Sequence, residues 1–88
     1  MDQAVFEAEL KSAGYSQIET KALGPNPGNT EHAHDYDVRG LVLDGIFIVR
    51  EGKSVTYRAG EIFAAPARTK HSEEIGGQGA HIIVGRKY

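Results

Sequence analysis

The chain has 88 residues and no cysteine, and its 10 basic and 12 acidic side chains give a net charge of −2 and a pI of about 6.0. This balance gives no reason to expect the basic surface that nucleic acid or an anionic membrane requires, and no apolar run reaches the length of a membrane span. A single domain of this size buries only about 60 to 65 per cent of its unfolded surface, so without disulfides a bound metal or a partner subunit is expected to stabilise it.

Residues 2–13 are predicted to form a short helix. Asp2 is suited to cap its first turn, Phe6 and Leu10 fall on one apolar stripe, and Gly14 stands where helices commonly end. We expect this helix to lie as a lid on the rest of the molecule. The first residues lack the basic start and apolar core of a signal peptide, so a cytoplasmic location is expected.

The rest of the chain predicts short strands separated by turn residues. The expected strands are residues 15–23, 38–43, 46–50, 54–58, 62–65, 71–75 and 80–84. Asp44-Gly45 is a strong signal for a tight hairpin turn, and the glycine cluster at 76–79 is expected to separate two strands. This spacing predicts an antiparallel sandwich or barrel. Residues 1–14 would then be the helix that packs on the barrel, and residues 15–88 the barrel domain.

Two expected strands, residues 41–43 and 46–49, are apolar at every position. A sheet with one wet face would show polar residues at every second position. Both faces are therefore expected to be covered. The helix is suited to cover part of the outer face, and a second copy of the chain in a homodimer is expected to cover the rest, because two-fold dimers are the commonest oligomers.

Three histidines form the main candidate site. In an extended segment side chains alternate, so His32 and His34 point to one side, and His71 is the obvious third member. Neutral imidazole is the commonest protein ligand for transition metals. The competing interpretation is three unrelated histidines in the core or on the surface, because a pair with this spacing often occurs by chance.

Two groups of residues have a characteristic order and spacing. The first group comprises His32, His34 and Gly45. The second group comprises Gly60, Pro66 and His71. Together they resemble the two motifs of the small single-domain cupins, and the resemblance covers about residues 26–84. It implies an all-β fold, an antiparallel jelly-roll β-barrel with a short N-terminal helix here, that holds a metal inside the barrel.

The chain departs from the cupin motifs at several positions. Val38 stands where the first motif has glutamate, and Gly28 lies closer to the histidines than the motif's opening glycine. In the second motif Arg68 replaces a glycine and Ile75 an asparagine. The resemblance therefore supports three histidine ligands but not the family's usual carboxylate ligand.

A substitute carboxylate is available at Glu73. It stands two residues after His71, on the same face of an extended strand, which makes it the candidate fourth ligand. The alternative is a solvated residue at a strand edge, since charged side chains are mostly exposed. The candidate pocket residues are Tyr36, Val38 and Arg68. Tyr36 could instead pack at the rim of the pocket, and Arg68 could instead lie in a solvated loop.

The resemblance leaves the function open among three classes. The first is an enzyme like the cupin dioxygenases, isomerases or decarboxylases, acting on a small organic substrate. The second is a non-catalytic ligand-binding module, and the third is a structural module whose fold is stabilised by its metal. Three imidazoles suit iron, manganese, zinc, nickel and copper, so the expected cofactor is a divalent transition metal of unspecified identity.

Overall fold

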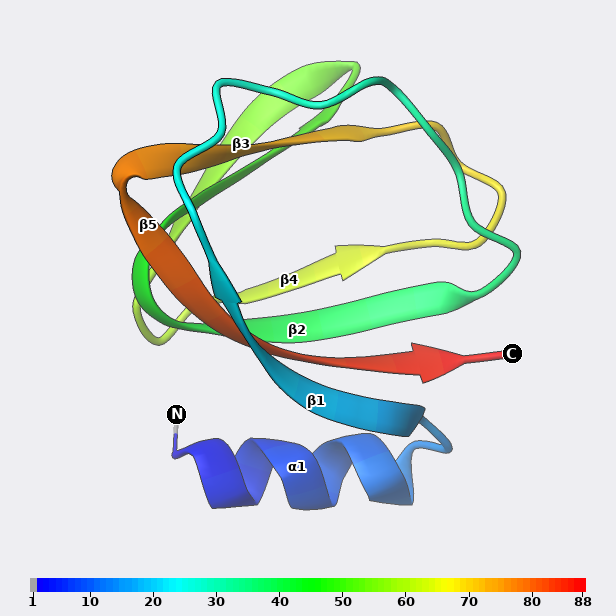
Figure 1. The fold of residues 1–88 in the computed structure, drawn as a ribbon. Helices are drawn as coiled ribbons and strands as arrows, with labels where there is room; N and C mark the ends of the chain where they lie inside the picture. The colour runs from blue at the N-terminus through cyan, green and yellow to red at the C-terminus, as the bar shows by residue number, and fades with distance from the viewer. Residues whose placement is uncertain (1) are drawn as a thin grey trace.

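The computed structural model describes residues 2–88, in which one helix precedes five strands. The elements are α1 (Gln3–Ser12), β1 (Ser16–Leu23), β2 (Asp37–Glu51), β3 (Lys53–Arg58), β4 (Ile62–Ala65) and β5 (Ser72–Lys87). The strands curve around a common interior, and α1 lies outside them next to β1 (Figure 1).

The helix begins and ends where the sequence predicts. The carboxylate of Asp2 accepts hydrogen bonds from the backbone N–H groups of Ala4 at 2.7 Å and Val5 at 3.3 Å, which satisfies donors left free in the first turn. Gly14 follows the last turn with a φ of +90°, a conformation that glycine adopts without strain. Both signals for the helix are therefore confirmed.

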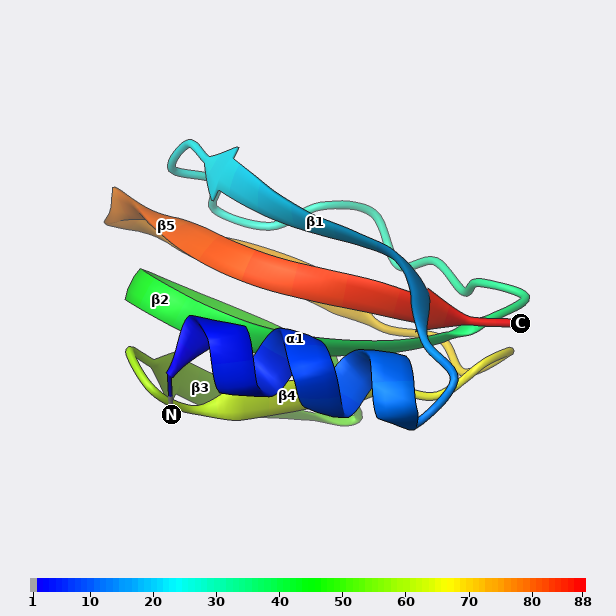
Figure 2. The same cartoon turned by 90° about the horizontal axis from the view of Figure 1, so that it is seen from below.

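The apolar stripe of α1 covers part of the outer face of the sheet. Phe6 and Leu10 are 0% and 1% exposed, and they pack with Leu41 of β2 and Ile83 of β5. Seen from below, the helix crosses in front of β2 (Figure 2). Ile46, also on β2, remains 36% exposed. The helix therefore covers part of the apolar outer surface, and the second subunit that we expect over the rest stays a prediction.

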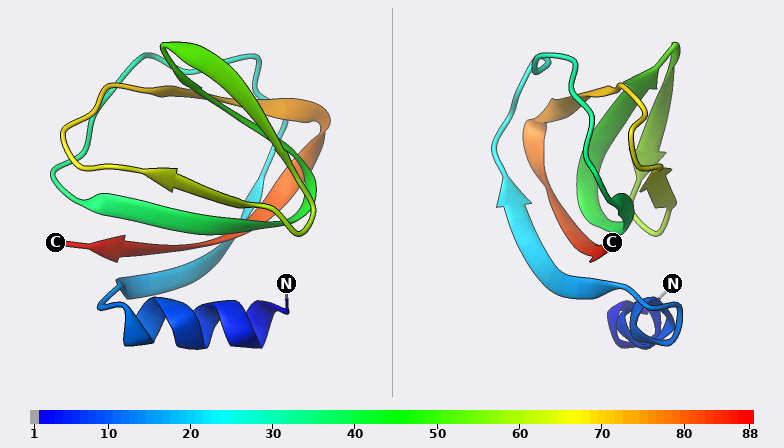
Figure 3. Two further views of the ribbon diagram at one scale, coloured as in Figure 1. Left: turned by 180° about the vertical axis from the view of Figure 1, so that it is seen from behind. Right: turned by 90° about the vertical axis from the view of Figure 1, so that its right-hand side faces the viewer.

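The two longest strands, β2 and β5, form the central pair of the barrel. The strand order is β1-β5-β2-β3, and β4 also pairs with β2. β2 and β5 pair antiparallel along almost their whole length, from Asp37 opposite Lys87 to Arg50 opposite Ser72. The first half of β2 has β4 on its other edge and the second half has β3, so the paired strands wrap around the interior (Figure 3).

The predicted hairpin turn at Asp44-Gly45 is wrong. β2 continues through these residues, and its register with β5 shifts between Val42 and Asp44 and again between Gly45 and Phe47. Gly45 has a φ of +82°, so a residue that is suited to a tight turn serves here in a β-bulge. The bulge bends one long strand instead of reversing the chain.

The glycine cluster at residues 76–79 likewise does not separate two strands. β5 runs through it without a break, and Gly79 has a φ of +75°. Ala80 pairs with Gly45 across the ladder, so the bend in β5 lies opposite the bend in β2. A side chain at Gly45 would collide with the backbone of β5, and one at Gly79 with the backbone of Leu23 on β1, so glycine at each bend permits the close approach of a neighbouring strand.

The core lies inside the curved sheet. Its buried members are Val42, Phe47, Val49, Phe63, Ile75, Ala80, Ile82 and Val84. Along β5, Ile82 and Val84 face this interior, whereas Ile83 between them packs under the helix. The architecture is thus an antiparallel β-barrel with one short helix, which confirms the all-β prediction. Within residues 2–88, no helix has the length and apolarity to cross a membrane.

Candidate metal centre

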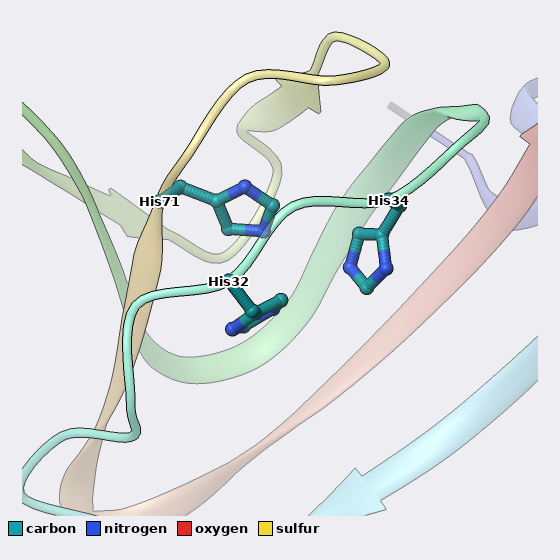
Figure 4. Close-up of side chains that lie close together, drawn as sticks. All are labelled: His32, His34 and His71. Atoms are coloured by element: carbon teal, nitrogen blue, oxygen red, sulfur yellow. The ribbon is translucent and has the colours of Figure 1, made fainter.

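The three histidines come from two segments that meet at one end of the barrel. His32 and His34 lie in the segment between β1 and β2, and His71 immediately precedes β5. His32 and His71 form an isolated antiparallel bridge, in which each backbone N–H donates to the other residue's carbonyl at 2.8 Å. This pairing, rather than the regular strand that we expected, brings the rings to the same side (Figure 4).

The rings form a compact cluster. Their centroids lie 4.5 Å apart for His32 and His71, 4.9 Å for His32 and His34, and 5.3 Å for His34 and His71. One nitrogen from each ring lies within 4.8 Å of the other two. Two metal–nitrogen bonds of about 2.1 Å span up to about 4.2 Å, so small rotations of these rings bring all three onto one ion. The donor set therefore fits a divalent transition metal.

Two of the rings are held in the tautomer that leaves Nε2 available to a metal. His32 Nδ1 lies 2.8 Å from the carbonyl oxygen of Thr30, and His71 Nδ1 lies 3.2 Å from that of Thr69. A carbonyl oxygen accepts but cannot donate, so in each pair we assign the proton to Nδ1. Nε2 of each neutral ring then keeps its lone pair. Such carbonyl contacts behind a histidine commonly orient metal ligands.

The third ring is favoured in its neutral form by its surroundings. Burial, and then the charges that His32 and His71 would carry, lowers the pKa of His34 below its ordinary value of 6.5. Because metals bind the deprotonated ring, a lowered pKa favours binding at neutral pH. Exposure differs within the cluster: His71 is 3% exposed, whereas His32 and His34 are half-buried. The cluster is therefore open toward His34 and His32.

Glu73 lies beside the cluster rather than within it. One of its carboxylate oxygens is 3.5 Å from His32 Nε2, and the group of ligand atoms that lie mutually close comprises the histidines without it. Asn29 fixes the backbone of Glu73 with two hydrogen bonds, accepting its N–H at 2.7 Å and donating to its carbonyl at 3.1 Å. The carboxylate is therefore placed next to a nitrogen that a metal would use.

A cavity of about 170 Å³ opens beside the histidines. Its lining comprises Lys21, His32, His34, Tyr36, Val38, Phe63, Glu73, Ile82, Val84 and Arg86. Tyr36 stacks on His34 with ring centroids 4.8 Å apart and planes 19° apart. Val38 also faces this cavity, so an apolar side chain stands where the cupin motif has glutamate. Of the expected pocket residues, Tyr36 and Val38 therefore line the site.

Arg68, the remaining expected pocket residue, has a different place. Its side chain is exposed, and it is not among the described residues that line the cavity. Its backbone N–H donates to the carbonyl oxygen of His34 at 2.7 Å, and its φ is +58°. Arg68 thus holds the segment that carries His34 through its backbone, while its side chain points elsewhere.

Sequence reasoning missed two cationic residues of the cavity, Lys21 and Arg86. Arg86 shares the inward face of β5 with Ile82 and Val84, at the spacing of alternate residues, so this alternation was a usable signal. Lys21 comes from β1, and it enters the site because it pairs with Ile82 of β5. That pairing joins strands from opposite ends of the chain, and local pattern does not reveal it.

No family model and no curated protein matches the sequence. Solved structures do match its fold. A cupin-2 domain containing protein from Shewanella frigidimarina aligns at 19% identity and a TM-score of 0.70, over 85% of this chain and 72% of that one. An RmlC-like cupin from the same organism aligns at 20% and 0.67, over 81% and 65%. A predicted oxalate decarboxylase from Thermotoga maritima aligns at 19% and 0.67, over 90% and 71%.

These neighbours define the fold. The protein has the jelly-roll barrel of the cupins, and its fold is that of a small single-domain cupin. The expectation drawn from the two motifs is thereby confirmed for the fold. The histidine cluster fits a metal-binding cupin.

Proposed function

We propose that the protein binds one divalent transition metal ion through His32, His34 and His71. The observation that carries this proposal is the pair of contacts from His32 Nδ1 and His71 Nδ1 to backbone carbonyls, at 2.8 and 3.2 Å. Unrelated core or surface histidines have no need of a shared orientation. Here two rings keep a lone pair on Nε2, and the third lies against both.

The cavity favours a ligand-binding role over a purely structural metal. A structural site is usually closed by four protein ligands, whereas this cluster offers three nitrogens beside a cavity of about 170 Å³. A bound ion with open positions polarises the oxygen atoms of a ligand. Tyr36 and Val38 line the space in which that ligand would lie, and they limit its size and exclude bulk water from one side.

We further propose that the reaction is of the dioxygenase type. Besides the histidines, the cavity lining offers Tyr36, Glu73 and Lys21 as groups able to move a proton, because the guanidinium of Arg86 stays protonated. Isomerases and hydrolases require a positioned general acid or base. Oxygen chemistry asks less of the side chains, because metal and dioxygen carry it. The competing proposal is a ligand-binding module without a reaction, which has the same metal and the same cavity.

The first test is metal content. We expect about one iron, manganese or other transition metal ion per chain in protein purified without a histidine tag, and much less in His34→Ala. His81→Ala is the matched control, because His81 pairs with Asp44 at 2.7 Å outside the cluster and half of its side chain is exposed. A full equivalent of metal in His34→Ala would refute the assignment. Oxygen uptake with small organic acids then separates enzyme from binding module.

A further inference from the structure

The cavity beside the histidines has more positive than negative charge. Its charged lining residues are Lys21, Arg86 and Glu73. The ammonium group of Lys21 lies 3.3 Å from the carboxylate of Glu19, which offsets its charge. Glu73 lies against His32, 3.5 Å from its Nε2. With Lys21 paired to Glu19, the charges of Arg86 and Glu73 balance in the metal-free cavity, and a divalent ion on the histidines would give the site an excess of positive charge.

The contacts of Arg86 are with uncharged side chains. Its Nη1 donates to the neutral side-chain oxygen of Gln17 at 3.1 Å, and its guanidinium carbon lies 4.8 Å from the ring centroid of Tyr36. Among residues 2–88, no carboxylate forms an ion pair with it. A guanidinium has five N–H donors in a planar fork that matches a carboxylate. A side-chain hydrogen bond with Tyr88 also holds Arg86. Arg86 is thus fixed in place by uncharged groups, and no acidic partner occupies its fork.

The position of Arg86 connects it to the metal ligands. Tyr36 contacts both Arg86 and His34, whose ring stacks on it at 4.8 Å between centroids. Gln17, which holds the guanidinium, has a φ of +50° and lies where the register of β1 and β5 shifts between Ser16 and Glu19. This bulge aims the amide of Gln17 at Arg86. The result is an oriented cation one aromatic ring away from a metal ligand.

We propose that Arg86 binds the carboxylate of a small organic acid whose second oxygen donor reaches the metal held by the histidines. This inference rests on the proposed metal site and adds the class of its ligand. The cavity of about 170 Å³ shares Lys21, Glu73 and Ile82 with a second cavity of about 320 Å³. It has room for a molecule at least the size of benzene, which an apolar cavity of about 150 Å³ holds. A small 2-hydroxy or 2-oxo acid has the required charge and donors.

The test compares an acid with its neutral analogue on zinc-loaded protein. Lactate and lactamide have the same shape and the same hydroxyl, but only lactate is charged at neutral pH. Their affinities are measured by NMR titration at fixed ionic strength, with zinc content determined for every sample. The variants are Arg86→Gln, which removes the charge, Arg86→Lys, which keeps it, and Arg58→Gln, which makes the same charge change outside the residues that line the cavity.

We expect lactate to bind more tightly than lactamide, and Arg86→Gln to weaken lactate at least about tenfold, as the loss of a charge-assisted hydrogen bond does. Lactamide affinity should not change, Arg86→Lys should retain part of the lactate affinity, and Arg58→Gln should match the parent. Full zinc content with equal lactate affinity in Arg86→Gln and parent would overturn this inference alone. A parent protein that takes up no zinc would overturn the metal site and, with it, this inference.

Discussion

Replacing His34 with alanine should abolish most of the thermal stabilisation that zinc gives the protein. His34 is the ligand whose removal disturbs the metal-free fold least: it is half-buried, and within residues 2–88 its ring makes no side-chain hydrogen bond. His71, in contrast, is 3% exposed and bonded to Thr69. Truncating a partly exposed side chain without such bonds costs about 1 kcal/mol or less, so the metal-free variant should melt near the parent.

The magnitude follows from linkage. A ligand that binds only the folded state stabilises it by about 2.7 kcal/mol at a free concentration of 100 Kd. In a domain of 88 residues, each kcal/mol shifts Tm by about 4–8 °C, so zinc should raise the Tm of the parent by roughly 11–22 °C. Loss of an outer-shell partner alone weakens metal binding about 10–100-fold, and loss of a ligand should exceed this. At the same zinc concentration the variant then gains about 0.4 kcal/mol or less, which is about 2–3 °C.

The assay is circular dichroism melting of parent, His34→Ala and His81→Ala, each with chelator and with zinc. His81→Ala should keep the full zinc shift, because its ring pairs with Asp44 away from the cluster. The reasoning is refuted if His34→Ala shifts as much as the parent. It is also refuted if zinc leaves the parent's Tm unchanged at a concentration that saturates any specific site.

Three other predictions concern the surroundings of the site and the barrel. Glu73→Gln should lower zinc affinity by about tenfold as a neighbour of the ligands, whereas Glu74→Gln, whose carboxylate pairs with Arg50, should leave it unchanged in a chelator competition. The folded-state pKa of His34 is lowered from 6.5, so the unfolded chain binds more protons between the two pKa values. The metal-free protein should therefore lose stability as pH falls from 6.5 through the lower folded-state pKa. His34→Ala should flatten this pH dependence of the unfolding free energy in urea titrations. Gly45→Ala should destabilise the fold by roughly 3 kcal/mol, because the added methyl group collides with backbone atoms and the φ of +82° strains an alanine. Gly52→Ala, at a φ of +78° with open space around it, should cost about 1 kcal/mol. Equal urea midpoints for the two variants would contradict this.

Local signals predicted the elements that are decided locally. The Asp2 cap and Gly14 define the ends of α1 to within a residue, because capping depends on atoms two or three residues apart. β4 ends at Ala65, directly before Pro66, which lacks the N–H that a ladder needs. The grouping of the three histidines was likewise predicted, from the motif spacing, and a backbone bridge between His32 and His71 brings two of the rings together.

The two bends of the barrel were not predictable in the same way. Asp44-Gly45 has the composition of a tight turn, and a positive φ at Gly45 suits either a turn or a bulge. The choice depends on β5, which pairs with both halves of β2 and so keeps the strand continuous. A window of ten residues contains no information about a partner some 35 residues away, so the glycines were assigned to chain reversal instead of curvature.

The charge of the cavity has the same long-range origin. Lys21 and Arg86 become neighbours of the histidines through the pairing of β1 with β5, which joins the two ends of the sequence. In the cupin motif a glutamate supplies negative charge at the position that Val38 occupies here, on the cavity wall. Replacing that carboxylate by an apolar side chain leaves a divalent ion with neutral ligands, and Arg86 adds a cation without an acidic partner. Both departures favour a bound ligand that brings negative charge to this site, in addition to the carboxylate of Glu73.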